Sequence, residues 1–477
     1  MGEAEPSSAA ARVLADAYLL QRVLSYVPME DMLRHVPLVS KAFRDASQWC
    51  WAELELDALR LGPTAPAPGA AAAFWRGLAA WAGRRAAGIR SLKLLNVRHL
   101  LRDLDEGQRL AALAGLWQAL ASGAGGGGPA LQSLELGRSS VALAPGTLAA
   151  AACLTGMREL TLYSAGPIDF AEVDAIAQSL CQLESLTLCL LRQRGVHSSF
   201  RGPFPAALTR LRRLRRLHLE APYSGFIAPQ CALPDGIGAW GGQMRELLLI
   251  NLGLECLPPS IGRLTALREL CLGRNRLGAR HDSLPVELAE LTSLVRLELQ
   301  YNGFEWGPPA VVGELTTLEE LNLSGNLWGS AAPDLPKEYA QLSRLRYLTL
   351  TNCELLVLPP VVRGMAGLQL LKLNINRLQT LPSGPYLQEL ECLDLAHNRF
   401  AAGYPHALAG APKLQLIAFQ HRGVHYSDPA VALLDAFAPA SPRLTGALAA
   451  AVLAAAAAQP GLQPLPVLEL ELGPLIN

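Results

Sequence analysis

Between positions 244 and 410, leucine and polar residues alternate in a pattern that repeats along the chain. One copy of the pattern begins at Leu267 and continues with Leu270, Leu272, Asn275 and Leu277, at offsets of three, five, eight and ten. Matching copies open at Met244, Leu294, Leu318, Leu345, Leu368 and Leu390, with periods of 22 to 27. Two of the leucines alternate with a single residue, which predicts a short strand with one buried face in every copy.

The positions after each predicted strand are also specific. Asparagine stands at offset eight, where the chain must leave the strand and its amide can satisfy unpaired backbone groups. The residues at this place are Asn275, Asn302, Asn326, Asn376 and Asn398, with Cys353 in one copy and Leu252 in another. A Leu-Pro pair follows in most copies, and proline's fixed φ suits an irregular return segment.

The pattern LxxLxLxxNxL resembles the leucine-rich-repeat family, in which each unit supplies one parallel strand and a return segment. The resemblance implies an α/β solenoid, a horseshoe with a parallel β-sheet on its concave face. One unit cannot bury its own leucines, so the repeats must stack.

Weaker copies extend the array in both directions. Longer units open at Ile89, Leu131, Met157, Leu183 and Leu214 without the asparagine, and we expect helices in their return segments. The predicted organisation has six parts. They are a disordered N-terminus (1–12), a helical bundle (13–56), a linker and capping helix (57–88), longer repeats (89–243), short Leu-Pro repeats (244–413), and terminal repeats with an Ala-rich cap (414–477).

The bundle at 13–56 predicts three short helices and carries the phrases LSYVP, EDML and LVSKAFR before two tryptophans. It resembles an F-box, although Val13 to Ala15 stand where the family usually has Leu-Pro. The resemblance implies binding to a Skp-type adaptor and, through it, a cullin. The residues at matching adaptor-binding positions are Leu24, Tyr26, Val27, Pro28, Asp31, Leu33, Leu38, Val39 and Phe43. The alternative is a helical cap that only closes the array.

Charge and composition limit the classes of partner and ligand that the chain is expected to bind. With 41 basic and 41 acidic residues, the chain has no net field that would attract nucleic acid or an anionic membrane. The nine cysteines are scattered singly and the N-terminus shows no signal-peptide pattern, so we expect a reduced, cytoplasmic or nuclear protein. His421 and His425 lack ligands at metal spacing, and we expect no metal, no cofactor and no catalytic residue.

Exposed positions between the leucines form the candidate binding surface. In a parallel stack, equivalent residues of successive units lie about 4.8 Å apart and form columns. The expected concave-face residues are Arg216, His218, Glu246, Glu269, Arg296, Glu298, Tyr301, Glu320, Asn322, Tyr347, Thr349, Lys372 and Asp394. Tyr301 and Tyr347 lie near arginines and are the expected anchors. The alternative is that the charged columns only satisfy one another.

Two functional hypotheses follow. The first is the non-catalytic substrate-recognition subunit of a Skp-cullin-F-box ubiquitin ligase, which binds a protein substrate through the concave face and is otherwise a monomer. The second is a leucine-rich-repeat scaffold or regulator, cytoskeletal, axonemal or GTPase-linked, without any role in ubiquitin transfer.

Overall fold

The computed structural model describes residues 53–57, 70–101, 104–122, 131–137, 143–192, 198–222, 231–328, 334–400 and 405–418. The chain divides into two compact units. The first comprises Met1–Arg276 and Asp282–Leu294, and the second comprises Leu277–His281 and Val295–Asn477. The F-box-like residues up to 52 and the Ala-rich segment lie outside the described residues.

The described strands of the first unit form one parallel sheet in sequence order. They are β1 (Glu53–Asp57), β2 (Ser91–Leu95), β3 (Ser133–Leu136), β4 (Glu159–Ser164), β6 (Ser185–Leu190), β8 (Arg216–Glu220), β9 (Glu246–Ile250) and β10 (Glu269–Cys271). Leucine lies opposite leucine in the register, as at Leu186 and Leu217. These leucines point into the core, so the residues between them form the open face of the sheet.

One boundary differs from the sequence prediction. Residues 53–56, which the pattern had grouped with the helical bundle, form most of β1 and pair with β2. Leu54 and Leu56 are buried in the same way as the leucines of the next strand. Their alternation with glutamates is a strand pattern, although the unit lacks the longer repeat phrase that would have identified it.

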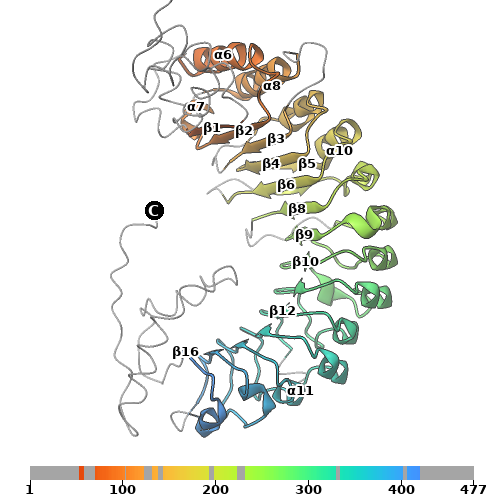
Figure 1. Cartoon of the computed structure of the whole chain (residues 1–477), viewed down its shortest axis with the longest axis vertical. Helices are drawn as coiled ribbons and strands as arrows, with labels where there is room; N and C mark the ends of the chain where they lie inside the picture. Colours follow the sequence, from red (N-terminus) through yellow and green to blue (C-terminus); the bar gives the residue numbers. More distant parts are fainter. Residues whose placement is uncertain are drawn as a thin grey trace, which may run out of the picture. The chain divides into compact units, whose positions relative to one another are not determined.

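The return segments of the first unit change from α-helices to short 3-10 turns along the chain (Figure 1). Helices are α6 (Ala70–Gly83), α7 (Arg98–Leu101), α8 (Glu106–Ser122), α9 (Thr147–Ala150) and α10 (Phe170–Ser179). Later segments contain the 3-10 turns η3 (Ala206–Arg210), η4 (Asp235–Gln243), η5 (Pro259–Arg263) and η7 (Val286–Glu290). Beside α10, β5 (Ile168–Asp169) and β7 (Phe200–Arg201) form a small separate sheet. Helix α6 packs on α8, and its buried Trp75 donates a hydrogen bond to the Leu100 carbonyl at 2.9 Å.

The second unit repeats the same arrangement with shorter strands. They are β11 (Arg296–Glu298), β12 (Glu320–Asn322), β13 (Tyr347–Thr349), β14 (Leu370–Lys372), β15 (Cys392–Asp394) and β16 (Leu416–Ala418), all parallel and in sequence order. The turns that return the chain are η6 (Leu277–Ala279), η8 (Ala310–Glu314), η9 (Lys337–Gln341), α11 (Pro360–Arg363), η10 (Pro385–Leu387) and η11 (His406–Gly410).

Proline sets the start of several return turns. Pro258, Pro285, Pro336 and Pro359 occupy the N-cap positions of η5, η7, η9 and α11. Each has a φ between −74° and −50°, which the pyrrolidine ring already imposes. Each proline carbonyl accepts the first backbone hydrogen bond of its turn. The Leu-Pro pair therefore places a buried leucine and begins the turn in two consecutive residues.

In the repeats that carry it, the asparagine at offset eight forms hydrogen bonds that join its own repeat to the repeat before it. The Asn376 amide donates to the carbonyls of Leu350 and Leu373 at 2.7 and 2.9 Å, and its oxygen accepts from the N–H groups of Cys353 and Leu355, both at 3.0 Å. The side chain is 5 % exposed. Asn275, Asn326 and Asn398 donate in the same way. The predicted role of this position is confirmed.

The residue before this asparagine takes a left-handed backbone conformation. Arg274, Tyr301, Ile375 and His397 have φ between 54° and 61°, and Gly325 has φ of 68° at the same place. A Cβ at Gly325 would meet the Tyr301 ring. The sharp departure from the strand therefore turns these side chains away from the leucine core and toward the edge of the sheet.

We predict that Asn376→Ala lowers the free energy of unfolding by about 2 to 4 kcal/mol, because buried carbonyl and N–H groups lose their partner. The exposed Gln388→Ala serves as the control and should stay within about 0.5 kcal/mol of the unsubstituted chain. Urea unfolding followed by circular dichroism measures both. Equal midpoints for the two variants would contradict the role assigned to the amide.

Candidate functional site

Charged residues of the first unit meet across adjacent strands of the open face. Arg216 on β8 lies opposite Glu246 on β9, and its guanidinium binds the carboxylate through two contacts, one of 2.8 Å. Glu269 follows next in the register. The hydrogen bond with Glu246 raises the pKa of Arg216. Because about half of the Arg216 side chain is exposed, the ion pair contributes little to the free energy of folding, and its main effect is on the charge distribution of the open face.

The second unit contains a similar pair. Arg296 on β11 binds Glu320 on β12 at 2.7 Å, and Tyr347 is the next residue along the same column. Both charged side chains are less exposed than Arg216, at 31 % and 21 %. The expected column therefore exists, and its charged members are paired.

Three other expected residues have contacts next to their strands. Asn322 accepts from the Ser324 N–H at 3.1 Å, and Asp394 accepts from the Ala396 N–H at 3.0 Å. Asp394 is only 3 % exposed, so its carboxylate shapes the turn after β15 and offers little surface to a partner. Glu298 accepts a hydrogen bond from the Gln300 amide.

Thr349 and Lys372 are two further expected residues that lie on the open face of the second unit. Lys372 lies opposite Asp394 in the register.

Large apolar side chains are exposed in the loops that follow strands β11, β12, β13 and β14 of the second unit. We call these exposed loop residues the post-strand edge. Its exposed members are Tyr301, Trp306, Leu327, Leu356, Val357 and Ile375. Trp306 is 71 % exposed and its ring lies 6.2 Å from that of His281. Phe304 and Trp328 occupy leucine positions and are buried, as the repeat register predicts.

Trp306 was not singled out from the sequence. It lies two residues beyond the buried Phe304, so the repeat register itself places it outside the core. Tyr301 is 43 % exposed at its left-handed position, whereas Tyr347 is half-buried on the sheet face. Tyr301 lies in the turn after β11 and Tyr347 lies on β13, so β12 separates the repeats of the two expected tyrosine anchors.

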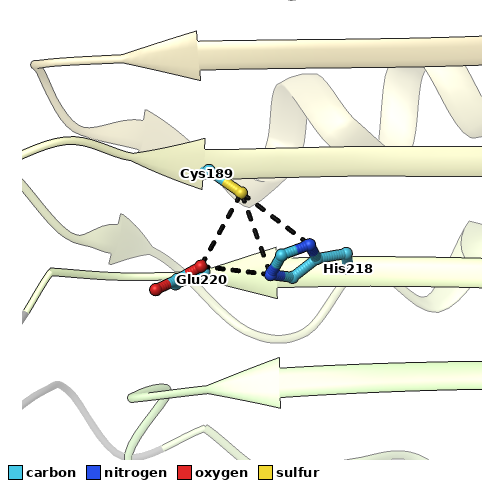
Figure 2. A group of neighbouring side chains, drawn as sticks. All are labelled: Cys189, His218 and Glu220. Carbon is cyan, nitrogen blue, oxygen red and sulfur yellow. Dashed lines mark hydrogen bonds and ion pairs between the residues drawn. The ribbon is translucent and has the colours of Figure 1, made fainter. Parts of the chain in front are cut away.

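A second missed group lies on the open face of the first unit. Figure 2 shows Cys189 on β6 pointing toward His218 and Glu220 on β8. The Cys189 sulfur is 3.8 Å from His218 Nε2 and 3.9 Å from Glu220 Oε2, and Nε2 is 3.1 Å from that same oxygen. The sequence identified His218 alone. Glu220 lies two residues farther along the same strand, whereas Cys189 becomes a neighbour of both only through the register of β6 on β8.

The electrostatics of this group favour a protonated thiol. Cys189 is 6 % exposed, and burial together with the Glu220 carboxylate raises its pKa to about 12. Its thiol donates to Glu220, and the hydrogen bond from His218 lowers the pKa of that carboxyl. A thiol in this state is a poor nucleophile.

The geometry also differs from a catalytic Cys-His-acid relay. A relay places the nucleophile and the acid on opposite ring nitrogens. Here the Glu220 oxygen contacts Nε2, while the sulfur is 3.8 Å from Nε2 and 3.9 Å from Nδ1 and is therefore aligned with neither. The group instead directs one sulfur, one nitrogen and one oxygen toward a common point.

The expected adaptor-binding positions, from Leu24 to Phe43, lie outside the described residues. Within the described part of the chain, no helix combines the length and apolar character needed to cross a bilayer.

The parallel strand stack, the asparagine column and the short return turns define this chain as a leucine-rich-repeat protein. No protein-family profile matches it. Mouse podocan-like protein 1 is 32% identical over 191 residues, which is 34% of this chain and 33% of that protein. The human volume-regulated anion channel subunit LRRC8E is 32% identical over 194 residues, or 40% of this chain and 22% of that protein. The chain thus spans a third or less of the length of these relatives.

Two solved structures are similar to this chain in part. A Leptospira interrogans leucine-rich-repeat protein has a TM-score of 0.40 and 21% identity, covering 81% of this chain and 97% of that one. A Listeria monocytogenes internalin has a TM-score of 0.40 and 16% identity, covering 69% of this chain and 94% of that one.

We predict that Arg216→Ala and Glu246→Ala each lower the free energy of unfolding by less than about 1 kcal/mol, because solvent and salt screen the exposed pair. A double-mutant cycle in urea should give a coupling of about 0.2 to 1 kcal/mol that shrinks as salt is added. The same cycle on Arg296 and Glu320 is the comparison. A salt-independent coupling above about 2 kcal/mol would show that the charges are structural.

Proposed function

We propose that this chain is a non-catalytic scaffold that binds a protein partner through the open face and post-strand edge of its second unit. The single observation that carries the proposal is the set of exposed apolar side chains in the loops that follow the strands of the second unit, whose open face carries a paired, half-buried charged column. Apolar anchors next to polar groups are the composition of a protein interface.

Trp306 and Tyr301 are the proposed anchors. Trp306 is largely exposed although it is held next to the His281 ring, and Tyr301 is held by its left-handed backbone above Gly325. An aromatic side chain with few rotatable bonds gives large contact area at low cost in conformational entropy. Leu327 is exposed in the next repeat and Ile375 is exposed two repeats after that.

The charged column adds selectivity to this surface. Arg296 and Glu320 satisfy each other, so a partner gains little by pairing with either one alone. Thr349 and Lys372 lie farther along the face. A partner that places apolar groups against the post-strand edge and polar groups against the charged column would complement both sets of side chains.

The F-box-like segment suggests a more specific role, as a substrate receptor of a Skp-cullin-F-box ubiquitin ligase. In that role residues 13–56 bind the Skp-type adaptor, and the repeats bring a substrate close to the ubiquitin donor. This role rests on the sequence motif alone, and it would place the protein in the cytoplasm or nucleus. The scaffold role without ubiquitin transfer has the better support, because it needs only the repeat surface.

We predict that a photo-crosslinking residue in place of Trp306 captures the partner in cells, because this position is an anchor of the interface. The matched control carries the same residue in place of Glu314, an exposed position on turn η8 of the same repeat. Once the partner is purified, Trp306→Ala should weaken its binding about tenfold or more. Equal crosslinking at both positions, or capture at 314 alone, would place the interface elsewhere.

For the ligase role, we predict that the intact chain binds a purified Skp-type adaptor and that Leu24→Arg with Pro28→Gly abolishes the binding. Gln21→Ala is the control, because Gln21 lies in the same segment, before the first matched position, Leu24, and is not one of the matched positions. A pull-down with purified components measures the interaction. Failure of the unsubstituted chain to bind the adaptor would exclude the receptor role and leave the scaffold role intact.

A further inference from the structure

We propose that Cys189, His218 and Glu220 bind a zinc ion on the open face of the first unit. The three side chains come from two adjacent parallel strands, and their ligand atoms lie within 4.8 Å of one another (Figure 2). The site is independent of the protein-binding surface proposed for the second unit.

The separations between the donor atoms approach those of a tetrahedral site. Bonds of about 2.3 Å to sulfur and about 2.0 to 2.1 Å to nitrogen and oxygen place ligands about 3.5 Å apart when sulfur is one of them and about 3.3 Å otherwise. The observed separations from sulfur are 3.8 and 3.9 Å, and the nitrogen to oxygen separation is 3.1 Å. Shifts of a few tenths of an ångström, within reach of side-chain rotation, would complete three edges of the tetrahedron.

The donor set selects the metal. A thiolate and an imidazole favour zinc over magnesium or calcium, which prefer oxygen ligands. When the sulfur–zinc bond forms, the Cys189 thiol proton leaves to solvent, and His218 binds through the lone pair of Nε2 as the neutral tautomer that carries its proton on Nδ1, so that the Nε2 hydrogen bond to Glu220 is replaced by the bond to zinc. The thiolate and the carboxylate then balance the two charges of the ion. A buried thiol beside a carboxylate, an arrangement that raises the free energy of the ionised sulfur, becomes favourable once the cation lies between them.

The strand framework holds the ligands in place. Cys189 lies opposite Glu220 in the register, and His218 lies opposite Thr187 two residues earlier. β4 and β9 flank this pair of strands, so neither strand is at an edge of the sheet. Ligands on regular strands are positioned more precisely than ligands on loops.

The fourth position is available to water. The His218 and Glu220 side chains are 22% and 42% exposed, so the group opens onto the face and is not sealed in the core. Three protein ligands with one open position distinguish such a site from a closed structural zinc site with four protein ligands.

The test uses the full chain, stripped of metal with a chelator and titrated with zinc in a calorimeter. We expect one zinc per chain, and an affinity at least about tenfold lower in Cys189→Ser, His218→Ala and Glu220→Gln. Cys181→Ser removes an exposed thiol close in sequence and should bind as the unsubstituted chain does. Cobalt provides a second readout, because thiolate-to-cobalt absorption should appear in the unsubstituted chain and in Cys181→Ser and be absent from Cys189→Ser.

Circular dichroism of each variant checks that the fold is intact, and Glu220→Gln keeps the side-chain shape in case another variant unfolds. The proposal is overturned if the unsubstituted chain binds no zinc at one equivalent. It is equally overturned if the folded variants bind zinc as the unsubstituted chain does, or if Cys181→Ser loses binding. Loss of zinc in the three ligand variants alone supports it.

Discussion

The hydrogen bonds of a buried asparagine amide hold one repeat to the next. A chain that leaves a strand sharply exposes backbone carbonyls and N–H groups in the interior, where each one lacking a partner costs free energy. Asn376 forms hydrogen bonds with such groups in its own repeat and in the preceding repeat. Cys353 substitutes for the amide at the same place, where its thiol donates to the Leu323 carbonyl at 3.4 Å. In the repeats that carry it, this polar column satisfies backbone groups that the stacked leucines would otherwise bury without partners.

The open face is a consequence of that core. Because leucines take every second position of a strand, the residues between them face outward with equal regularity. Parallel pairing then places the outward-facing residue of one repeat directly beside the equivalent residue of the next repeat, as with Arg216 and Glu246. The same rule brings thiol, imidazole and carboxylate together at Cys189, His218 and Glu220.

The sequence correctly predicted the structural features that depend only on the spacing of residues within one repeat. The leucine register, the asparagine position and the burial of Phe304 and Trp328 all follow from local periodicity. The Cys189 group was missed, because units of unequal length hide which residues become neighbours across strands. Asp394 was expected on the surface, whereas its burial depends on a turn that the pattern does not specify. The F-box-like motif stays a prediction.

Gly325 links two repeats in a way that the leucine pattern does not express. Its missing side chain leaves the space in which the Tyr301 ring lies, and its own φ of 68° suits glycine. The orientation of an aromatic group in one repeat is thus set by a residue of the following repeat. A substitution at either position is therefore constrained by the other, so the shape of the proposed binding surface is set here by two repeats together instead of by one repeat alone.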